Sequence, residues 1–194
     1  MVHFQKAEQL KQQADNLLRD KCIINNLSQF ANLNLTGSYT LDLMVWPDID
    51  LQIEITDKNR DRVRVFTDLA YHFLHDRDFK KINLIHFTPG KKATMPTGMY
   101  MGMNCRHGDL DWKIDIWALD PEHQAANEKY MNQVQSALTE PTRIRILDWK
   151  HRLLKDGRVP QLGSYLLYKA ILFEKLISDQ EIENYLTEHG FTWS

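Results

Sequence analysis

The sequence lacks the features that mark secreted and membrane-spanning proteins. It has only two cysteines, Cys22 and Cys105, and no apolar run near the roughly 20 residues that a membrane-spanning helix needs. Its N-terminus is charged and rich in glutamine, unlike a secretory signal peptide. These absences predict a cytoplasmic protein without a membrane partner.

The sequence also lacks an excess of charge of one sign. A formal net charge of −2 gives no long-range attraction to a polyanion. Processive binding of nucleic acid would therefore have to come from a local basic patch. This favours a small-molecule or protein substrate over a nucleic acid.

The most regular pattern in the chain covers residues 48–55. Acidic or polar side chains alternate there with isoleucine and leucine, as the two-residue repeat of a half-buried strand requires. Asp48 and Asp50 therefore share the polar face, about 7 Å apart along the strand. Two carboxylates so placed can bind a divalent cation such as Mg²⁺, whose oxygen ligands lie at about 2.0–2.1 Å.

A second short motif, Gly37-Ser38, precedes Asp48 by nine intervening residues. Glycine lets the backbone turn sharply and approach a ligand closely. Free backbone N–H groups and a serine hydroxyl can then hold phosphate oxygens. The sequence thus predicts a phosphate site next to the metal site.

These motifs together resemble those of the nucleotidyltransferase superfamily that includes DNA polymerase beta. The resemblance rests on Gly37-Ser38, the length of the spacer and the sequence Asp48-Ile49-Asp50-Leu51. It implies an α+β fold, in which a small mixed or antiparallel sheet with flanking helices precedes a C-terminal helical bundle. Residues 39–42, Tyr-Thr-Leu-Asp, depart from the small or arginine-containing sequence of many relatives, which affects the phosphate contacts and not the metal ligands.

Residues 98–117 contain two further alternating stretches, which predict a hairpin. A two-residue turn at His107-Gly108 would pair positions that sum to a constant. It would place Tyr100 opposite Asp115, Gly102 opposite Lys113 and Asn104 opposite Asp111. The polar faces of both strands then coincide, and a glycine there either leaves room for a group to lie across the face or marks a kink.

The superfamily has a third carboxylate on a later strand, and Asp115 is the best candidate for it. Asp115 lies between Ile114 and Ile116, in the hydrophobic-Asp-hydrophobic setting of the first motif. Asp111 has the same facing and is the rival, but it lies nearer the turn. Glu54 shares a face with Asp48 but lies farther along the same strand.

The resemblance implies a metal-dependent enzyme that moves a nucleoside monophosphate from a nucleoside triphosphate to an unidentified small-molecule or protein acceptor and releases pyrophosphate. Asp48, Asp50 and Asp115 would be the catalytic residues and would bind Mg²⁺ or Mn²⁺. Gly37 and Ser38 would hold the beta and gamma phosphates. Lys113 and Tyr100, which share the predicted polar face, complete the expected nucleotide-binding set.

We expect two regions, a catalytic core with an N-terminal helix at residues 1–119 and a helical region at residues 120–194. Residues 142–158 carry an excess of basic side chains, which either contact a triphosphate or an acidic substrate or form a solvated helix face. The basic residues of this stretch are Arg143, Arg145, Lys150, Arg152, Lys155 and Arg158.

Two alternatives remain open from the sequence. The first is a catalytically silent nucleotide-binding or regulatory module of the same fold, against which the complete triad argues. The second is a terminal nucleotidyltransferase acting on nucleic acid, for which a more basic chain or an added recognition domain would be expected.

Overall fold

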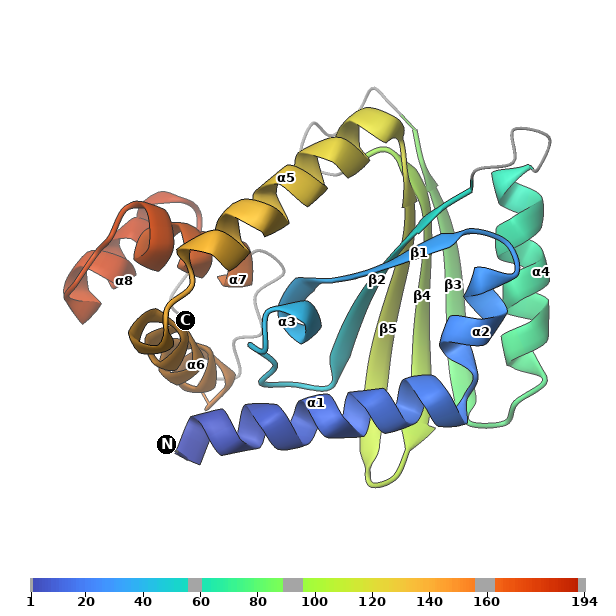
Figure 1. Ribbon diagram of the computed structural model, residues 1–194, viewed down its shortest axis with the longest axis horizontal. Coiled ribbons are helices and arrows are strands. Elements are labelled where there is room, and N and C mark those ends of the chain that lie inside the picture. The colour runs from blue at the N-terminus through green and yellow to red at the C-terminus, as the bar shows by residue number, and fades with distance from the viewer. Residues whose placement is uncertain (1, 56–60, 89–95, 156–162, 192–194) are drawn as a thin grey trace.

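The protein is described here from a computed structural model that covers residues 2–55, 61–88, 96–155 and 163–191. A five-stranded sheet forms its centre, with α1, α2 and α4 beside it, and α5 leads away from the sheet to a separate group of helices (Figure 1). The strands are β1 (Asn32–Thr36), β2 (Asp48–Glu54), β3 (Phe79–Phe87), β4 (Gly98–His107) and β5 (Leu110–Leu119).

The helices fall into two groups along the chain. Those before β5 are α1 (Val2–Asp20), α2 (Ile23–Ser28), α3 (Gly37–Thr40) and α4 (Arg62–Leu74). Those after it are α5 (Pro121–Ala137), α6 (Glu140–Lys155), α7 (Gly163–Tyr168), the π-helical η1 (Lys169–Phe173) and α8 (Asp179–Glu188). The α+β fold class expected from the resemblance is confirmed.

The sheet has the strand order β1-β2-β5-β4-β3. Its central pair, β2 and β5, is parallel, and the other neighbouring pairs are antiparallel. The sheet is therefore mixed, and it joins two segments more than fifty residues apart in sequence at its centre.

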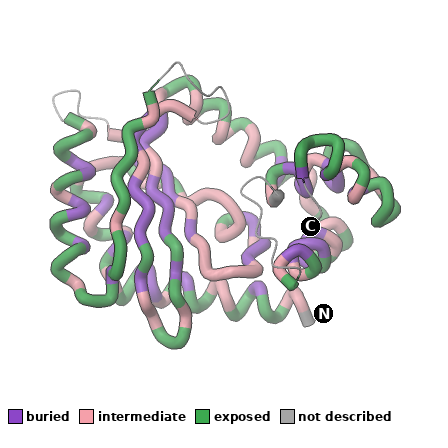
Figure 2. The backbone as a smooth tube through the Cα atoms, turned by 180° about the vertical axis from the view of Figure 1, so that it is seen from behind, coloured by how far each residue is buried: buried purple, intermediate pink, exposed green. Residues whose placement is uncertain are grey.

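Strand alternation gives the sheet one apolar face. Ile49, Leu51, Met101, Ile114 and Ile116 are fully buried there and pack in one cluster with side chains of α1, α2 and α4. Among the strands, buried positions concentrate on β2, β4 and β5 (Figure 2). The opposite face of the sheet is left open for a site.

A second hydrophobic cluster holds the helices that follow the sheet. It joins residues of α5, α6, α7, η1 and α8 with Ala7 of α1 and with Leu41 and Leu43, which precede β2. The helical region thus packs on segments from the first quarter of the chain. The division at residues 119 and 120 stays a prediction.

Specific backbone features and side-chain contacts set the ends of several helices. Asp61 caps α4 by accepting a hydrogen bond from the Val63 N–H at 3.0 Å. The π-helix η1 ends at Phe173, and Lys175 just after it takes a left-handed backbone conformation with φ of 55°. Ser178 and Glu181 form a capping box at the start of α8.

The predicted register of the β4–β5 hairpin is wrong by two residues. Tyr100 pairs with Trp117, Gly102 with Asp115 and Asn104 with Lys113, and His107 closes the hairpin with Leu110. The turn lies at residues 108–109, where Gly108 supplies the positive φ of 57° that a tight turn needs. A shift of two keeps every side chain on its predicted face.

None of the described helices combines the length and the apolar character that crossing a bilayer requires.

Candidate active site

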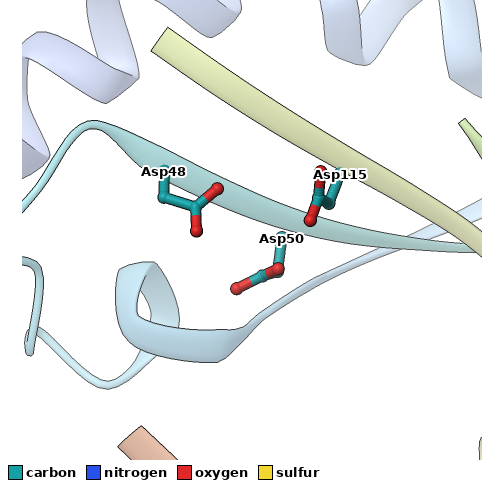
Figure 3. A group of neighbouring side chains, drawn as sticks. All are labelled: Asp48, Asp50 and Asp115. Atoms are coloured by element: carbon teal, nitrogen blue, oxygen red, sulfur yellow. The ribbon is translucent and has the colours of Figure 1, made fainter. Parts of the chain in front are cut away.

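The open face of the sheet brings the three predicted acids together. The parallel pairing sets Asp50 beside Asp115 and Asp48 beside Lys113 on adjacent strands. One carboxylate oxygen of each acid lies within 4.8 Å of one oxygen of each of the others. The three carboxylates face the same space next to α3 (Figure 3).

The rival acids do not join this cluster. Asp111 is exposed and forms ion pairs with Lys80 at 2.9 Å and Arg106 at 3.1 Å. Glu54 is exposed at the end of β2. Among the described residues, Asp48, Asp50 and Asp115 form the only group of three or more potential metal ligands whose ligand atoms lie within 4.8 Å of one another.

The triad lies in a cleft of about 1200 Å³ between the sheet and the helical region. From the sheet side the cleft is lined by the triad, Lys113, Tyr100, Trp117, Ile85 and Phe87, and from the helical side by Asn127, Tyr130, Met131, Lys150, Ser164, Tyr165 and Tyr168. Gly37, Ser38 and Trp46 also line it. The cleft is large enough to hold a nucleotide and part of a second molecule.

Gly37 makes room for the central acid. A Cβ at this position would lie 2.2 Å from Asp50 Oδ2, and the φ of +68° is one that other residues rarely adopt. The position therefore requires glycine for two independent reasons. It starts α3 directly in front of the triad, with Ser38 as the next residue.

Burial raises the pKa of two of the acids, Asp50 and Asp48. Burial and the nearby charges of Asp48 and Asp115 raise the pKa of Asp50 to about 7. Burial also raises the pKa of Asp48, and the buried Asp48 Oδ1 has no hydrogen-bond partner within the described residues. These oxygens fit a divalent cation, which would supply the missing positive charge.

Asp115, by contrast, has partners on both oxygens. The Tyr100 hydroxyl donates to Oδ1 at 2.8 Å and Lys113 Nζ donates to Oδ2 at 2.5 Å. Although burial lowers the pKa of Lys113, its hydrogen bond to Asp115 and the charge of Asp48, 3.7 Å away, outweigh this and raise it. Burial and Asp115 raise the pKa of the Tyr100 hydroxyl.

A glycine permits the contact between Tyr100 and Asp115. Gly102 is paired with Asp115, and a Cβ at Gly102 would lie 2.3 Å from the Tyr100 hydroxyl oxygen. The tyrosine side chain therefore lies across the glycine to reach the carboxylate. The room predicted at this position is taken by Tyr100.

Lys150 of α6 is the site residue that the sequence did not single out. Its side chain is 1% exposed, and Nζ donates to Ser38 Oγ at 2.8 Å and to the Leu43 carbonyl at 2.6 Å. The ring of Trp46 lies 4.5 Å from Nζ, a cation–π contact. Burial lowers the pKa of Lys150 to about 7, against the opposing effect of Asp50 and Asp48.

The other basic residues of the stretch 142–158 divide between tertiary contacts and solvent. Arg143 donates to the Leu41 carbonyl at 2.8 Å, and Arg152 pairs with Asp179 at 2.8 Å. Arg145 bonds the Ile177 carbonyl, Lys155 is exposed, and Arg158 lies outside the described residues. Of this predicted basic set, only Lys150 lines the cleft among the described residues.

No known family profile matches the chain, and no curated protein matches it. Among solved structures, a chain of the GLD-2/RNP-8 complex is similar, with a TM-score of 0.54 and 16% identity over 97% of this chain and 66% of that one. A chain from a complex of the non-canonical poly(A) polymerase GLD-2 with GLD-3 has a TM-score of 0.37 and 12% identity over 96% and 75%.

The first of these likenesses agrees with the fold predicted from the motifs. The chain therefore shares its α+β fold with that chain of the GLD-2/RNP-8 complex. It spans about two thirds of the length of the chain in the GLD-2/RNP-8 complex.

Proposed function

We propose that the chain is a metal-dependent nucleotidyltransferase that moves a nucleoside monophosphate from a nucleoside triphosphate to a hydroxyl of a second molecule. The observation that carries the proposal is the convergence of the Asp48, Asp50 and Asp115 carboxylates, with one oxygen each within 4.8 Å. The cleft around them contains hydroxyl and ammonium groups suited to a triphosphate.

Asp48, Asp50 and Asp115 would hold Mg²⁺ or Mn²⁺. Such ions lower the pKa of an attacking hydroxyl and neutralise charge on the phosphates. Asp48 Oδ1, which accepts no hydrogen bond within the described residues, and the raised pKa of Asp50 support this assignment, because Lys113 is the one ammonium paired with the three acids there.

Gly37, Ser38 and Lys150 would hold the beta and gamma phosphates. The first N–H groups of a helix have no partner within that helix, and Gly37 and Ser38 open α3. Lys150 Nζ lies 2.8 Å from Ser38 Oγ, so the ammonium and the hydroxyl can reach the same phosphate oxygens. A triphosphate would also give the buried Lys150 the charged partner that it lacks among the described residues.

In the transfer step the acceptor oxygen forms a bond to the alpha phosphorus. The bond from that phosphorus to the bridging oxygen breaks, and its electron pair leaves with pyrophosphate. Asp115 is placed to take the acceptor proton, and Tyr100 and Lys113 orient its carboxylate. Tyr100 and Lys113 are thus positioning residues.

The test is pyrophosphate release from each of the four nucleoside triphosphates, with Mg²⁺ or Mn²⁺ and a metabolite or protein extract as the source of acceptor. Asp48→Asn should abolish release, while Glu54→Gln, an exposed acid on the same strand, should retain it. Calorimetry should show tighter triphosphate binding when Mg²⁺ is present. An unchanged affinity would contradict the metal-dependent assignment.

The same measurements separate an enzyme from a silent nucleotide-binding module. A silent module would bind the metal–triphosphate complex without releasing pyrophosphate in any extract. The complete set of three converging carboxylates supports the active reading, since a module that only binds nucleotide does not need the acceptor-side acid.

A further inference from the structure

Three aromatic side chains lie together on the sheet face that carries the triad. Phe87 and Trp117 are stacked, with ring centroids 5.3 Å apart and planes at 27°. The Tyr100 and Trp117 centroids are 4.7 Å apart. Phe87, Tyr100 and Trp117, called the aromatic shelf below, all line the cleft.

The aromatic shelf begins where the triad ends. Trp117 follows Asp115 by two residues in β5, so the two side chains share a face about 7 Å apart. Tyr100 is paired with Trp117, and its hydroxyl donates to Asp115 at 2.8 Å. Phe87 extends the shelf onto β3, the edge strand.

The shelf is not part of the hydrophobic core. The neighbours of Trp117 in β5, Ile116 and Ala118, are buried on the other face of the sheet, whereas the three rings are only half-buried. Their exposed apolar surface therefore lies in the cleft. The shelf itself contains no charged side chain, which suits a planar neutral group more than an anion.

The proposed function divides the cleft between two substrates. The phosphate-binding groups Gly37 and Ser38 lie beside Asp50, on the side of the triad toward β1. The shelf lies on the other side, on β5, β4 and β3. With the phosphates held at Ser38 and Lys150, the shelf lies across the triad from them in the same cleft.

We propose that the aromatic shelf binds the acceptor through a nucleobase stacked on Trp117 and Phe87, with the sugar hydroxyl of the same nucleoside at Asp115. This inference rests on the proposed function. The distance from Asp115 to Trp117 matches the reach of one nucleoside from sugar to base. Aromatic rings stack on every base, so the shelf should accept all four.

The test is calorimetric binding to the full chain saturated with Mg²⁺ and a non-transferable methylene analogue of the triphosphate. Adenosine monophosphate and a short oligoadenylate should bind, and ribose 5-phosphate and methyl glucoside should not. Tighter binding of the oligonucleotide would identify a polynucleotide end as the acceptor, and equal binding would identify a mononucleotide.

Ring substitutions should weaken the base-bearing probes. Trp117→Leu should raise their dissociation constants about tenfold, and Trp117→Phe, which keeps a ring, only about threefold. Tyr71→Leu removes a ring that is 70% exposed on α4, outside the cleft, and is the matched control. If Trp117→Leu melts at a lower temperature than the wild type, Phe87→Leu provides a second test of probe affinity.

Two outcomes would contradict base binding at the aromatic shelf, and both can be told apart from failure of the proposed function. Ribose 5-phosphate binding as tightly as adenosine monophosphate would overturn it, and so would unchanged affinities in both Trp117→Leu and Phe87→Leu. Absence of binding of the metal–triphosphate complex to the wild-type chain would instead contradict the proposed function, while the base-bearing probes would still test the shelf on the free protein.

Discussion

The two walls of the cleft carry opposite and incomplete sets of charges. The sheet wall holds three carboxylates against one nearby cation, Lys113. The helical wall holds a buried ammonium, Lys150, whose hydrogen-bond partners among the described residues are a hydroxyl and a carbonyl. One wall lacks positive charge and the other lacks negative charge.

This difference identifies the kind of ligand that suits the cleft. A cation alone would satisfy the sheet wall and leave Lys150 without a negatively charged hydrogen-bond partner among the described residues. An anion alone would satisfy Lys150 and add to the repulsion among the acids. A metal–triphosphate complex brings a cation to the acids of the sheet wall and an anion to Lys150 of the helical wall. The charge of each wall therefore supports the ligand assigned to the other wall.

The strongest test of this difference between the walls is to remove one charge from the sheet wall. Asp50→Asn keeps the side-chain shape but should lower pyrophosphate release about 10³-fold or more, because a central electrostatic contact to the transition state is lost. The metal-free fold should be as stable or slightly more stable, because repulsion falls. Steady-state rates and thermal melting check both effects, with Glu54→Gln as the control.

A normal rate in Asp50→Asn would mean that β2 is not the catalytic strand. Ile49→Asp, on the opposite face, provides the converse case. It places an unpaired charge in the core and should unfold the protein without touching the site.

Removing the charge of the helical wall should have a smaller effect. Lys150→Met keeps the length of the side chain and should weaken triphosphate binding about 10²-fold, the loss expected for a charged hydrogen bond to phosphate. Binding of Mn²⁺ alone, measured by calorimetry, should stay within about twofold, because the triad is intact.

Lys155→Met, at the exposed end of the same helix, is the matched control for Lys150→Met. If both variants bind the triphosphate alike, Lys150 has a structural role only. A higher melting temperature for Lys150→Met would argue against a structural role, since it would mean that the buried ammonium destabilises the fold.

The two walls should also set opposite slopes of stability against pH in the metal-free protein. The raised pKa of Asp50, about 7 against a usual 3.8, means that the folded state holds a proton that the unfolded state loses; stability therefore falls from about pH 4 to 7. The lowered pKa of Lys150, about 7 against 10.5, has the reverse sign, so stability is regained from about pH 7 to 10.5.

The lowered pKa of His151, about 4 against 6.5, makes stability rise over part of the same range, so the two slopes are measured as differences between a variant and the wild type. In urea unfolding with a chelator, each difference should amount to roughly 2 kcal/mol after relaxation of the buried groups. Asp50→Asn should flatten the acid side and Lys150→Met the alkaline side. A difference in stability between Asp50→Asn and the wild type that stays constant from pH 4 to 7 would contradict the burial assigned to Asp50.

The acids of the sheet wall could be predicted from the sequence, and the buried lysine of the helical wall could not, for a physical reason. A strand repeats every two residues, so alternation alone placed Asp48, Asp50 and Asp115 on the polar face. Each side chain stays on the same face when the register is wrong by two residues, as it was for the β4–β5 hairpin. The parallel pairing of β2 with β5 joins distant segments, and no local pattern encodes it.

The burial of Lys150 depends on tertiary packing. A lysine in a basic amphipathic helix has the same local pattern whether it faces solvent or a cleft. Here Leu41 and Leu43 join the cluster formed by α6, and this docking covers the ammonium. The glycine at position 37 was expected to approach phosphate, but its contact with Asp50 also required the structure.

The smallest expected effect tests how the sheet wall orients Asp115. Tyr100→Phe removes the hydroxyl that donates to this carboxylate at 2.8 Å and should lower the rate about tenfold, with substrate affinity unchanged. Gly102→Ala should do the same by a different route, because the new Cβ would lie 2.3 Å from the tyrosine hydroxyl. The end of a flexible side chain can move away, so the strand should stay folded.

Because both changes remove one contact, their effects should not add. The double variant Tyr100→Phe/Gly102→Ala should be about tenfold slower than wild type, whereas independent effects would multiply to about a hundredfold. Tyr71→Phe, which alters an exposed tyrosine on α4, should leave the rate unchanged. A multiplicative loss in the double variant would mean that Gly102 serves the site in some way other than by letting Tyr100 reach Asp115.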